Sequence, residues 1–390
     1  MPHDRERHIS KQLRKALSFW PVVCIVGARQ VGKSTLLRAL KGYKYKSLDD
    51  DALRLLAETS PQSVLQDRCI IDEAQKAPGI FDAVKLSVDE EKRPGRFLLT
   101  GSVRFSKRTL IRESLTGRAK TLQLFPFTGA EAHQLPFEER LSGKSRPSRV
   151  GRSPFLKFAA SGGMPAAFAI RSPSERASYW SALTESYVHR DLLMAVGGRP
   201  DPRTAMAILR ASAETLALGE QPTLARILKK TMGSRAKVVR HIEALVDMMI
   251  LQRLPHWGAS ATKDVYLPFD PGLFLGLLKL TAIDHDKAVM RAALRLTLLK
   301  EAQAQSLYAG LEQDFFYAES PRGETLDLIA ESGKSKRAYQ ISIEPVPHPY
   351  STRYAKSWAS TQKGSLTVFS SASEPNAMDG FDIRPWEAMV

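Results

Sequence analysis

Short apolar runs alternate with amphipathic stretches over the first third of the chain. The segments "PVVCIV" at 21–26, "CII" at 69–71 and "FLL" at 97–99 are continuous and rich in β-branched or bulky residues. Such runs are typical of strands that are buried on both faces of a parallel sheet. The stretch "STLLRAL" at 34–40 instead spaces its apolar residues as a helix does. The pattern predicts an α/β domain built on a parallel sheet.

Helical periodicity dominates between residues 203 and 250. The segments "RTAMAILRASAETLA", "TLARILKK" and "RAKVVRHIEALVDMMILQRL" predict three helices, and the last one runs into an apolar, strand-like tail. The turn "TMGS" separates the second helix from the third. This order is typical of a winged helix-turn-helix module, in which the tail forms the wing.

Two further segments differ in character from the helices. The segment "FEERLSGKSRPSRVGRSP" at 137–154 is rich in Arg, Ser, Gly and Pro, which predicts an exposed connection. Toward the C-terminus, "FFYAESPRGETLDLIAESGKSKRAYQISIEP" predicts a strand, a turn, a second strand, a hairpin and a third strand.

The charge balance favours a polyanionic partner. Lys and Arg number 57 against 41 Asp and Glu, which gives a net charge of +16 and a pI near 9.8. Such a chain can bind nucleic acid by releasing counterions, although a generic basic protein has the same balance.

The two cysteines, Cys24 and Cys69, lie in apolar runs, which predicts buried thiols in a reducing cytoplasm. No apolar stretch reaches the roughly eighteen residues that span a bilayer, so no membrane partner is expected.

The stretch "GARQVGKST" at 27–35 lies between the first apolar run and the helix at 34–40, and it fits the pattern G-x-x-x-x-G-K-[ST]. In such a loop, glycines let backbone amides approach phosphate oxygens, and the helix start adds positive partial charge. Lys33 is expected to reach the β and γ phosphates and to act in catalysis, while Ser34 binds Mg²⁺. The expected contacts to ATP are Gly27, Ala28, Arg29, Gln30, Val31, Gly32, Lys33, Ser34, Thr35, Asp72 and Ser102.

Two adjacent carboxylates end the second apolar run, in "CIIDEAQ". Acids directly after a buried strand lie at the carboxyl edge of a parallel sheet, where ligands bind. Asp72 is expected to hold Mg²⁺, and Glu73 to activate the attacking water. In "RFLLTGS", Thr100 and Ser102 are expected to contact the γ-phosphate or that water, with an ordinary turn as the alternative. The sequence has no guanine-reading N-K-x-D segment, so ATP hydrolysis is expected rather than GTP hydrolysis.

Taken in order, the segments "GARQVGKST", "SLDDDALR", "IIDEAQKAPGIFDAVKLSVDE", "FLLTGSV", "SLTGRAKTLQLFPFTGAE" and "GGMPAA" resemble a family of prokaryotic AAA-type ATPases. In that family a P-loop domain is followed by a C-terminal domain of unknown function. Its members typically read G-x-R-Q-V-G-K-[ST], I-D-E-x-Q-x-x-P, L-T-G-S and S-L-x-G-R. The resemblance implies an ATPase of the AAA-like division that uses ATP and Mg²⁺, with Lys33, Ser34, Asp72 and Glu73 in the roles given above.

The same resemblance draws attention to Arg118 in "SLTGR". An arginine at this position is expected to stabilise charge on the leaving phosphate, in its own subunit or across a homo-oligomer interface. Arg112 is a rival for this role, and a solvated arginine is the alternative. In "SLDDD", Asp49 and Asp50 are expected to cap the following helix, with a place near the magnesium as the other possibility.

In that family the C-terminal region resembles a restriction-endonuclease-like fold. Its active form has an acid on one strand and E-x-K on the next. Here the acid is Asp327, but the E-x-K positions hold Gln340, Ile341 and Ser342. Gln340 carries no charge for a metal ion, and Ser342 does not replace the positive charge of a lysine. An inactive, degenerate nuclease-like domain is therefore expected.

The segment from Gln221 to Ile242 contains six basic residues and no acid. Side chains near the start of a recognition helix are the ones that reach base edges or phosphates. Ser234, Arg235, Lys237 and Arg240 are therefore expected to contact double-stranded DNA. Winged helices also serve as protein-interaction modules, so a protein partner is the alternative.

The expected fold class is α/β, with four parts along the 390 residues. These are a P-loop NTPase domain with a parallel sheet at 1–135, a basic connection with a helical segment at 136–202, a winged-helix module at 203–268 and the nuclease-like domain at 269–390. The expected function is a cytoplasmic, magnesium-dependent ATPase whose nucleotide state controls DNA binding. The alternative is a nucleotide-gated protein-interaction switch, of a defence or toxin-regulating type, with slow or no hydrolysis.

Overall fold

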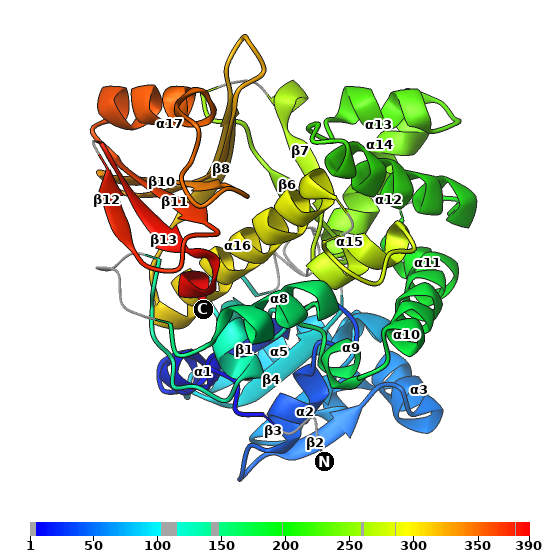
Figure 1. Cartoon of the computed structure of the whole chain (residues 1–390). Helices are drawn as coiled ribbons and strands as arrows, with labels where there is room; N and C mark the ends of the chain where they lie inside the picture. Colours follow the sequence, from blue (N-terminus) through cyan, green and yellow to red (C-terminus); the bar gives the residue numbers. More distant parts are fainter. Residues whose placement is uncertain are drawn as a thin grey trace. The chain divides into compact units, whose positions relative to one another are not determined.

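The computed structural model describes residues 5–102, 115–141, 148–196, 198–258, 261–284, 286–378 and 380–390. Figure 1 shows the whole chain, coloured along its sequence. The chain divides into two compact units. The smaller unit is Glu6–Phe125 with Asp247–Met249, and the larger unit is formed mainly by Pro126–Val246 and Ile250–Val390.

A five-stranded parallel sheet forms the centre of the smaller unit, in the order β2-β3-β4-β1-β5. The three predicted strands β1, β3 and β4 are buried along their whole length, which explains why they read as continuous apolar runs. The strands are β1 (Val22–Val26), β2 (Lys44–Ser47), β3 (Cys69–Asp72), β4 (Phe97–Gly101) and β5 (Ala119–Gln123). The helices are α1 (Ser10–Leu17), α2 (Lys33–Arg38), α3 (Asp51–Thr59), α4 (Pro61–Val64) and α5 (Gly79–Glu90), with a single turn η1 (Ala74–Lys76). A parallel sheet whose first strand leads through the phosphate-loop pattern into a helix is the expected P-loop NTPase architecture.

The strand order brings the ends of three strands, with their candidate functional residues, to one edge of the sheet. Strand β4 lies between β1, which leads into the phosphate-binding loop, and β3, which carries the acid pair. In register, Ile25 is beside Thr100, and Ser47 is beside Asp72. Because all five strands run the same way, their carboxyl ends meet at this edge, about 10 Å from β1 to β3.

The larger unit begins with helices and ends in a second sheet. Its helices are α7 (Gly129–Ala132), α8 (Arg152–Ser161), α9 (Pro165–Ala169), α10 (Pro173–Ser186), α11 (Leu192–Ala195), α12 (Pro202–Ala217), α13 (Leu224–Lys230), α14 (Arg235–Asp247), α15 (Pro271–Leu277), α16 (Lys287–Ala309) and α17 (Pro349–Gln362), with single turns η3 (Tyr187–Asp191), η4 (Ala261–Lys263) and η5 (Trp386–Met389). Its strands are β6 (Leu251–Leu254), β7 (Val265–Pro268), β8 (Asp314–Glu319), β9 (Thr325–Ser332), β10 (Ser335–Ile341), β11 (Ser365–Ser370), β12 (Asn376–Met378) and β13 (Phe381–Pro385). The three helices predicted between residues 203 and 254 are confirmed as α12, α13 and α14, and the strand-like tail is confirmed as β6.

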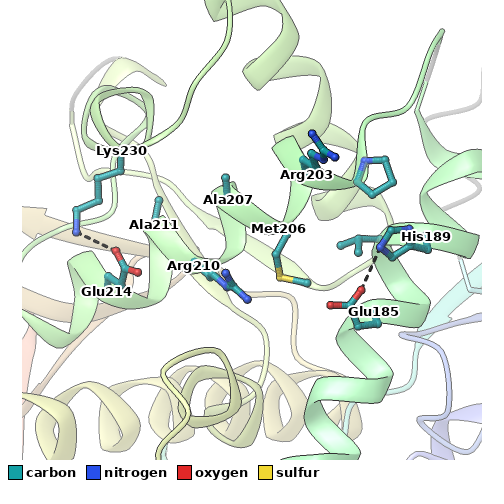
Figure 2. A pocket seen from close by; sticks show the side chains of 11 residues that line it. Glu185, His189, Arg203, Met206, Ala207, Arg210, Ala211, Glu214 and Lys230 are labelled. Atoms are coloured by element: carbon teal, nitrogen blue, oxygen red, sulfur yellow. Dashed lines mark hydrogen bonds and ion pairs between the residues drawn. The ribbon is translucent and has the colours of Figure 1, made fainter.

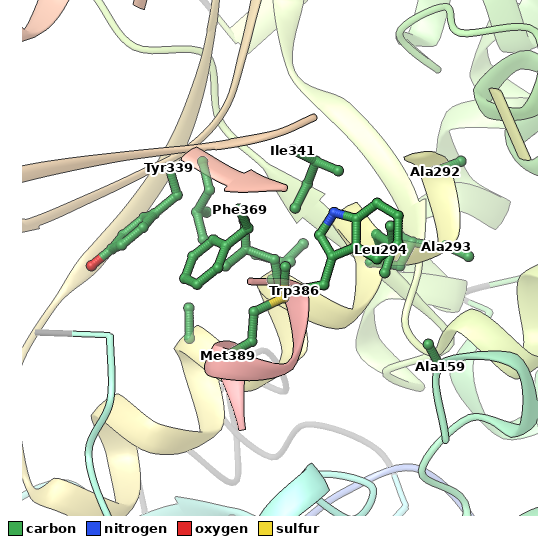
Figure 3. Close-up of a cluster of buried hydrophobic side chains, with 14 of the residues drawn as sticks. Ala159, Ala292, Ala293, Leu294, Tyr339, Ile341, Phe369, Trp386 and Met389 are labelled. Carbon is green, nitrogen blue, oxygen red and sulfur yellow. The ribbon is translucent and has the colours of Figure 1, made fainter. Parts of the chain in front are cut away.

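The second sheet has six strands in the order β12-β13-β11-β10-β9-β8, with both parallel and antiparallel pairs. One face packs against α17 through Trp358 and its neighbours. The other face packs against α16 and the C-terminal turn η5, where Tyr339, Phe369, Trp386 and Met389 lie together (Figure 3). A helix on each face buries both sides of the sheet and forms the core of the larger unit.

The prediction of an exposed connection at 137–154 is wrong at two positions. Leu141 and Val150 are only 6% and 4% exposed, and both join the core on the α16 face of the second sheet. The hydroxyl of Tyr339 donates a hydrogen bond of 2.7 Å to the carbonyl oxygen of Leu141. Two apolar residues among many polar ones show no periodicity, so the sequence pattern does not reveal their burial.

Helices of the described residues are too short or too polar to cross a lipid bilayer.

Candidate nucleotide site

The phosphate-binding loop runs from the end of β1 to the start of α2, and each of its two motif glycines is required for a different reason. Gly32 has a φ of 101°, in the left-handed region that favours glycine. A Cβ atom on Gly27 would lie 2.6 Å from the carbonyl oxygen of Leu124. Gly27 is therefore needed for packing against the chain that follows β5, a reason that the motif alone does not show.

Lys33 is held inside this loop. Its ammonium group donates hydrogen bonds of 2.9 and 3.1 Å to the carbonyl oxygens of Gly27 and Ala28, and the residue is only 5% exposed. The loop is also fixed from outside by Arg7, which is buried and donates to the carbonyl oxygens of Val31 and Phe125 at 2.9 and 2.5 Å. The motif points to Lys33 as a phosphate-binding residue, but it gives no sign of Arg7, because an isolated arginine in a basic N-terminal segment carries no local signal.

The carboxylate of Asp72 is the centre of the site. It accepts a hydrogen bond of 2.6 Å from the hydroxyl of Ser34, and further ones from the hydroxyls of Tyr45 and Thr100. Burial raises the pKa of this carboxyl, but the three hydroxyl donors and the nearby charge of Lys33 outweigh burial, so the pKa lies below its ordinary value. Asp72 is therefore held as a carboxylate.

Ser34 and Asp72 together fit a magnesium ion. Mg²⁺ is usually bound by one or two carboxylates, the phosphates of its nucleotide and several waters. The described residues offer no cluster of three His, Cys, Asp or Glu side chains, so this hydroxyl and carboxylate would be completed by phosphate and water oxygens. A bound ion would supply positive charge beside the β and γ phosphates.

Glu73 follows Asp72 with a left-handed backbone, at a φ of 57° and a ψ of 41°, which is uncommon for a residue with a side chain. The side-chain amide of Gln75 donates to the Glu73 carboxylate, and the Ser102 hydroxyl lies 3.5 Å from the same oxygen. Gln75 also donates to Ser102 at 3.3 Å. The structure thus brings Ser102 beside Glu73, and it adds Gln75 and Tyr45, which the sequence pattern did not single out.

Other predicted contacts lie in different surroundings. Ala28 and Val31 have buried side chains, so only their backbone can face a nucleotide. Thr35 is exposed on α2, while Gln30 is exposed and has a φ of 64°. Arg29 is partly exposed within the loop.

Arg118 is not brought to this site within its own chain. It comes directly before β5, and its carbonyl oxygen accepts a hydrogen bond from the backbone of Val22, the first residue of β1. The phosphate-binding loop follows the other end of β1, roughly 13 Å away along the strands. The Arg118 guanidinium pairs with Asp89 at 2.7 and 2.8 Å. The expected action within one subunit is therefore wrong, and the rival Arg112 lies outside the described residues.

In "SLDDD", the expected capping role is confirmed for Asp50, whereas Asp49 makes an ion pair instead. Asp50 caps α3, because its side chain accepts a hydrogen bond of 2.8 Å from the backbone of Leu53. Asp49 pairs with Lys76.

The predicted DNA-contacting residues lie at the start of α14. The Ser234 hydroxyl accepts a hydrogen bond of 3.3 Å from the backbone of Lys237. Arg235 and Arg240 are exposed and make no ion pair with a described residue. The ammonium of Lys237, in contrast, pairs with Asp201 at the start of α12. The acid-free stretch is therefore partly neutralised by an acid from outside it.

A cavity of about 460 Å³ lies beside α12 (Figure 2). Two of the positively charged or titratable side chains in its lining are also paired with acids. Lys230 pairs with Glu214 at 3.3 Å, and His189 lies 3.0 Å from Glu185. Figure 2 shows Arg203 and Arg210 on the same helix between these two pairs. Neither arginine makes an ion pair with any residue in the described ranges.

The connection between β6 and β7 is packed against the second sheet. The backbone of Trp257 donates a hydrogen bond of 2.7 Å to the carbonyl oxygen of Tyr317 on β8. The indole of Trp257 contacts Phe316 and Trp358 edge to face, with ring centroids 5.2 and 5.4 Å apart. The part of the predicted wing around Trp257 is therefore packed within the larger unit.

The nuclease-like positions are occupied by structural contacts. Asp327 is buried, and both of its oxygens accept hydrogen bonds of 2.9 Å from Arg291. The Gln340 amide donates to the carbonyl oxygen of Ser351 at 2.6 Å, and the Ser342 hydroxyl bonds to the carbonyl of Glu344 at 3.0 Å.

Comparisons with known proteins match two successive parts of the chain to two different family models. Residues 20–133 match the model of an AAA domain, and residues 153–284 match the model of a domain of unknown function (DUF8612). Uncharacterized proteins of Mycobacterium bovis and Mycobacterium tuberculosis are each 27% identical over 366 residues, which cover 90% of this chain and 76% of theirs.

Two solved structures are more distant. One is a signal transduction ATPase with numerous domains and a tetratricopeptide repeat sensor, from Pyrococcus horikoshii, with 13% identity and a TM-score of 0.23. The match covers 78% of this chain but only 48% of that one. The other is a protein from Vibrio cholerae with 10% identity and a TM-score of 0.19, matched over 90% of this chain and 88% of its own.

Proposed function

We propose that the protein is a magnesium-dependent ATPase that couples its nucleotide state to the binding of double-stranded DNA. The hydrogen bond of 2.6 Å between Ser34 and Asp72 carries the ATPase part, because it joins the phosphate-binding loop to the acid strand across β4. In this proposal Lys33 neutralises phosphate charge, Ser34 and Asp72 hold Mg²⁺, and Glu73 activates the attacking water. The match of residues 20–133 to an AAA domain supports the same assignment.

Hydrolysis is tested with Glu73→Gln and Lys33→Ala. We expect Glu73→Gln to keep ATP binding and to slow phosphate release on the order of 100-fold, because a general base typically contributes that much or more. Lys33→Ala is expected to weaken ATP binding itself. Glu58→Gln, an exposed change on α3, is the matched control. Phosphate release and binding of a fluorescent ATP analogue are measured, and release by Glu73→Gln at the wild-type rate would contradict the proposal.

A winged-helix reading of residues 203–268 supports the DNA part. Helices α12, α13 and α14 are followed by the antiparallel pair β6 and β7. An isolated bridge also joins Thr223, just before α13, to Val265 on β7. In this reading α14 is the recognition helix, and Arg235 and Arg240 are the residues available to phosphates or base edges.

Removal of these charges tests DNA binding. We expect the double variant Arg235→Gln/Arg240→Gln to weaken binding and to lower the salt dependence by about one unit of slope per charge removed. Lys237→Gln should have a smaller effect, because its ammonium already pairs with Asp201. Lys11→Gln, on the exposed side of α1, is the control. Fluorescence anisotropy with a DNA duplex at two salt concentrations measures the affinity and its salt dependence. An affinity independent of salt would argue against DNA binding through these charges.

The second candidate is a nucleotide-gated switch that grips another protein, with slow or no hydrolysis. The packing of Trp257, in the connection between β6 and β7, favours it, because a wing held there by Phe316 and Trp358 has less surface to offer a DNA groove. The engagement of Glu73 by Gln75 is compatible with slow hydrolysis. A homo-oligomer, in which Arg118 acts on a neighbouring subunit, is compatible with either function.

Phosphodiester cleavage by the second sheet is not part of the proposal. A metal ion at Asp327 would have to displace Arg291 from both carboxylate oxygens, and Gln340 and Ser342 supply neither the acid nor the lysine of an active site.

A further inference from the structure

A second cavity, of about 850 Å³, lies mostly in the region that matches the domain of unknown function, between α8, the start of α10 and residues 281–284. Its volume is within the range of small-molecule sites. Much of its wall is apolar, with side chains from three segments of the larger unit. These side chains are Leu156, Phe158, Phe168, Ile170, Ile283 and Met290.

The aromatic part of this wall is rigid. Phe158 is 1% exposed and meets Phe168 edge to face, with ring centroids 6.1 Å apart. The ring of His133 packs against both, at 6.2 and 6.4 Å, and its Nδ1 lies 2.8 Å from the carbonyl oxygen of Gly129. A wall fixed in this way costs a ligand little ordering.

Positive charge surrounds the apolar wall. Lys157 and Arg171 are exposed at the cavity, Arg176 is partly buried, and none of them makes an ion pair within the described ranges. A fourth cation, Arg152, is already engaged with Glu387 at 3.3 Å and with the carbonyl of Ser371. Asp284 is the acid in the lining.

Arg176 is the residue of this lining whose hydrogen-bonding groups are only partly satisfied among the described residues. One of its terminal nitrogens donates to the carbonyl oxygens of Ile170 and Arg171 at 3.1 and 3.3 Å, but its Nε is buried with no hydrogen-bond partner. Burial lowers the pKa of this guanidinium, and no carboxylate offsets that effect. A partly buried cation that pairs with no carboxylate of the described residues is unfavourable, and an anion in the cavity would lower that cost.

We infer that this cavity is a binding site for a small organic anion with an apolar body, held through its carboxylate, sulfonate or phosphate by Arg176. The apolar body lies against the partly exposed Phe168 and Ile170, while Lys157 and Arg171 add attraction at the entrance. This site is separate from the nucleotide site in chemistry and does not depend on ATP hydrolysis or on DNA binding. It gives the domain of unknown function a ligand of its own.

Titration of the full chain with 1-anilinonaphthalene-8-sulfonate, an aromatic anion that fluoresces in apolar surroundings, tests the site. We expect saturable binding with one site per chain, and competition by octanoate but not by 1-octanol or octylamine at equal concentration. Arg176→Gln is expected to weaken probe binding about tenfold, because a charge-assisted hydrogen bond is lost. Arg176→Lys, which keeps the charge, should restore part of the affinity.

Two further variants separate this site from general surface binding. Ala282→Trp fills the cavity from an exposed position and should block the probe without removing a charge. Arg210→Gln removes an exposed arginine that lies on α12, outside this cavity, and should leave binding unchanged (Figure 2). The inference is overturned if Arg176→Gln and Ala282→Trp both bind the probe within twofold of wild type. It is also overturned if 1-octanol competes as well as octanoate, or if Arg210→Gln weakens binding as much as Arg176→Gln.

Discussion

At the scale of single residues, the nucleotide site is organised around one carboxylate. Asp72 receives hydroxyl hydrogen bonds from Ser34, Tyr45 and Thr100, which come from three different elements. These donors keep the pKa of Asp72 low although burial acts against them. The acid is thus charged and oriented before any ligand arrives, which lowers the cost of binding a metal ion.

Removal of one donor should be measurable as a loss of stability. We expect Thr100→Val to lower the free energy of unfolding by about 1.5 to 3 kcal/mol at neutral pH, the usual value of a hydrogen bond to a charged group. The folded-state pKa of Asp72 is below its ordinary value of 3.8, so this contribution is present above that pH and is lost as the pH falls through the folded-state pKa.

Urea unfolding at pH 7, 5 and 3.5 measures this effect. The difference between wild type and Thr100→Val should be equal at the two higher pH values and smaller at the lowest. Thr35→Val, an exposed change on α2, is the control. A difference that grows toward low pH would show that Thr100 does not stabilise the charged form of Asp72.

At the scale of elements, the hairpin of β6 and β7 serves packing within the larger unit. Its connection is held by the backbone of Tyr317, by Phe316 and by Trp358, and the ammonium of Lys336 lies 5.1 Å from the ring centre of Trp257. A strand pair held through Trp257 joins α14 to the second sheet, and this role explains the apolar sequence of the tail without reference to DNA.

We therefore expect Trp257→Ala to act on stability and not on DNA. Loss of this partly buried ring should lower the free energy of unfolding by about 2 kcal/mol, somewhat less than for a fully buried tryptophan. The DNA affinity of the folded variant should stay within twofold of wild type. Denaturant unfolding measures the free energy of unfolding, and fluorescence anisotropy measures the DNA affinity. A loss of DNA affinity with unchanged stability would show that the hairpin contacts DNA.

At the scale of the whole molecule, the proposed coupling has a thermodynamic signature. If nucleotide state controls DNA binding, DNA must change nucleotide affinity by the same factor, because coupling free energies are reciprocal. With Glu73→Gln, which should hold ATP without hydrolysing it, we expect DNA affinity with ATP and with ADP to differ about tenfold. Isothermal titrations of ATP and of ADP, each with and without DNA, should show the ratio of the two nucleotide affinities changing by the same factor. A factor of one would favour the protein-gripping switch instead.

The net charge of +16 is distributed less simply than the sequence suggests. Within the acid-free stretch from residue 221 to 242, Lys237 pairs with Asp201 and Lys230 with Glu214, both acids of α12. A count along the chain cannot register an acid that is brought in by another helix, so the sequence overestimates the free positive charge of α14.

The sequence by itself determined the parallel sheet, the phosphate-binding loop and the acid strand. Each of these is recorded in a short local pattern: continuous apolar runs for buried strands, the spacing from Gly27 to Ser34 for the loop, and Asp72 directly after a strand. Tertiary structure decided which distant side chains join them. Arg7, Tyr45 and Gln75 reach the site only when the chain folds, whereas Arg118, placed near it by resemblance, lies at the opposite edge of the sheet. Contacts between remote segments depend on strand order and register, and a local pattern contains neither.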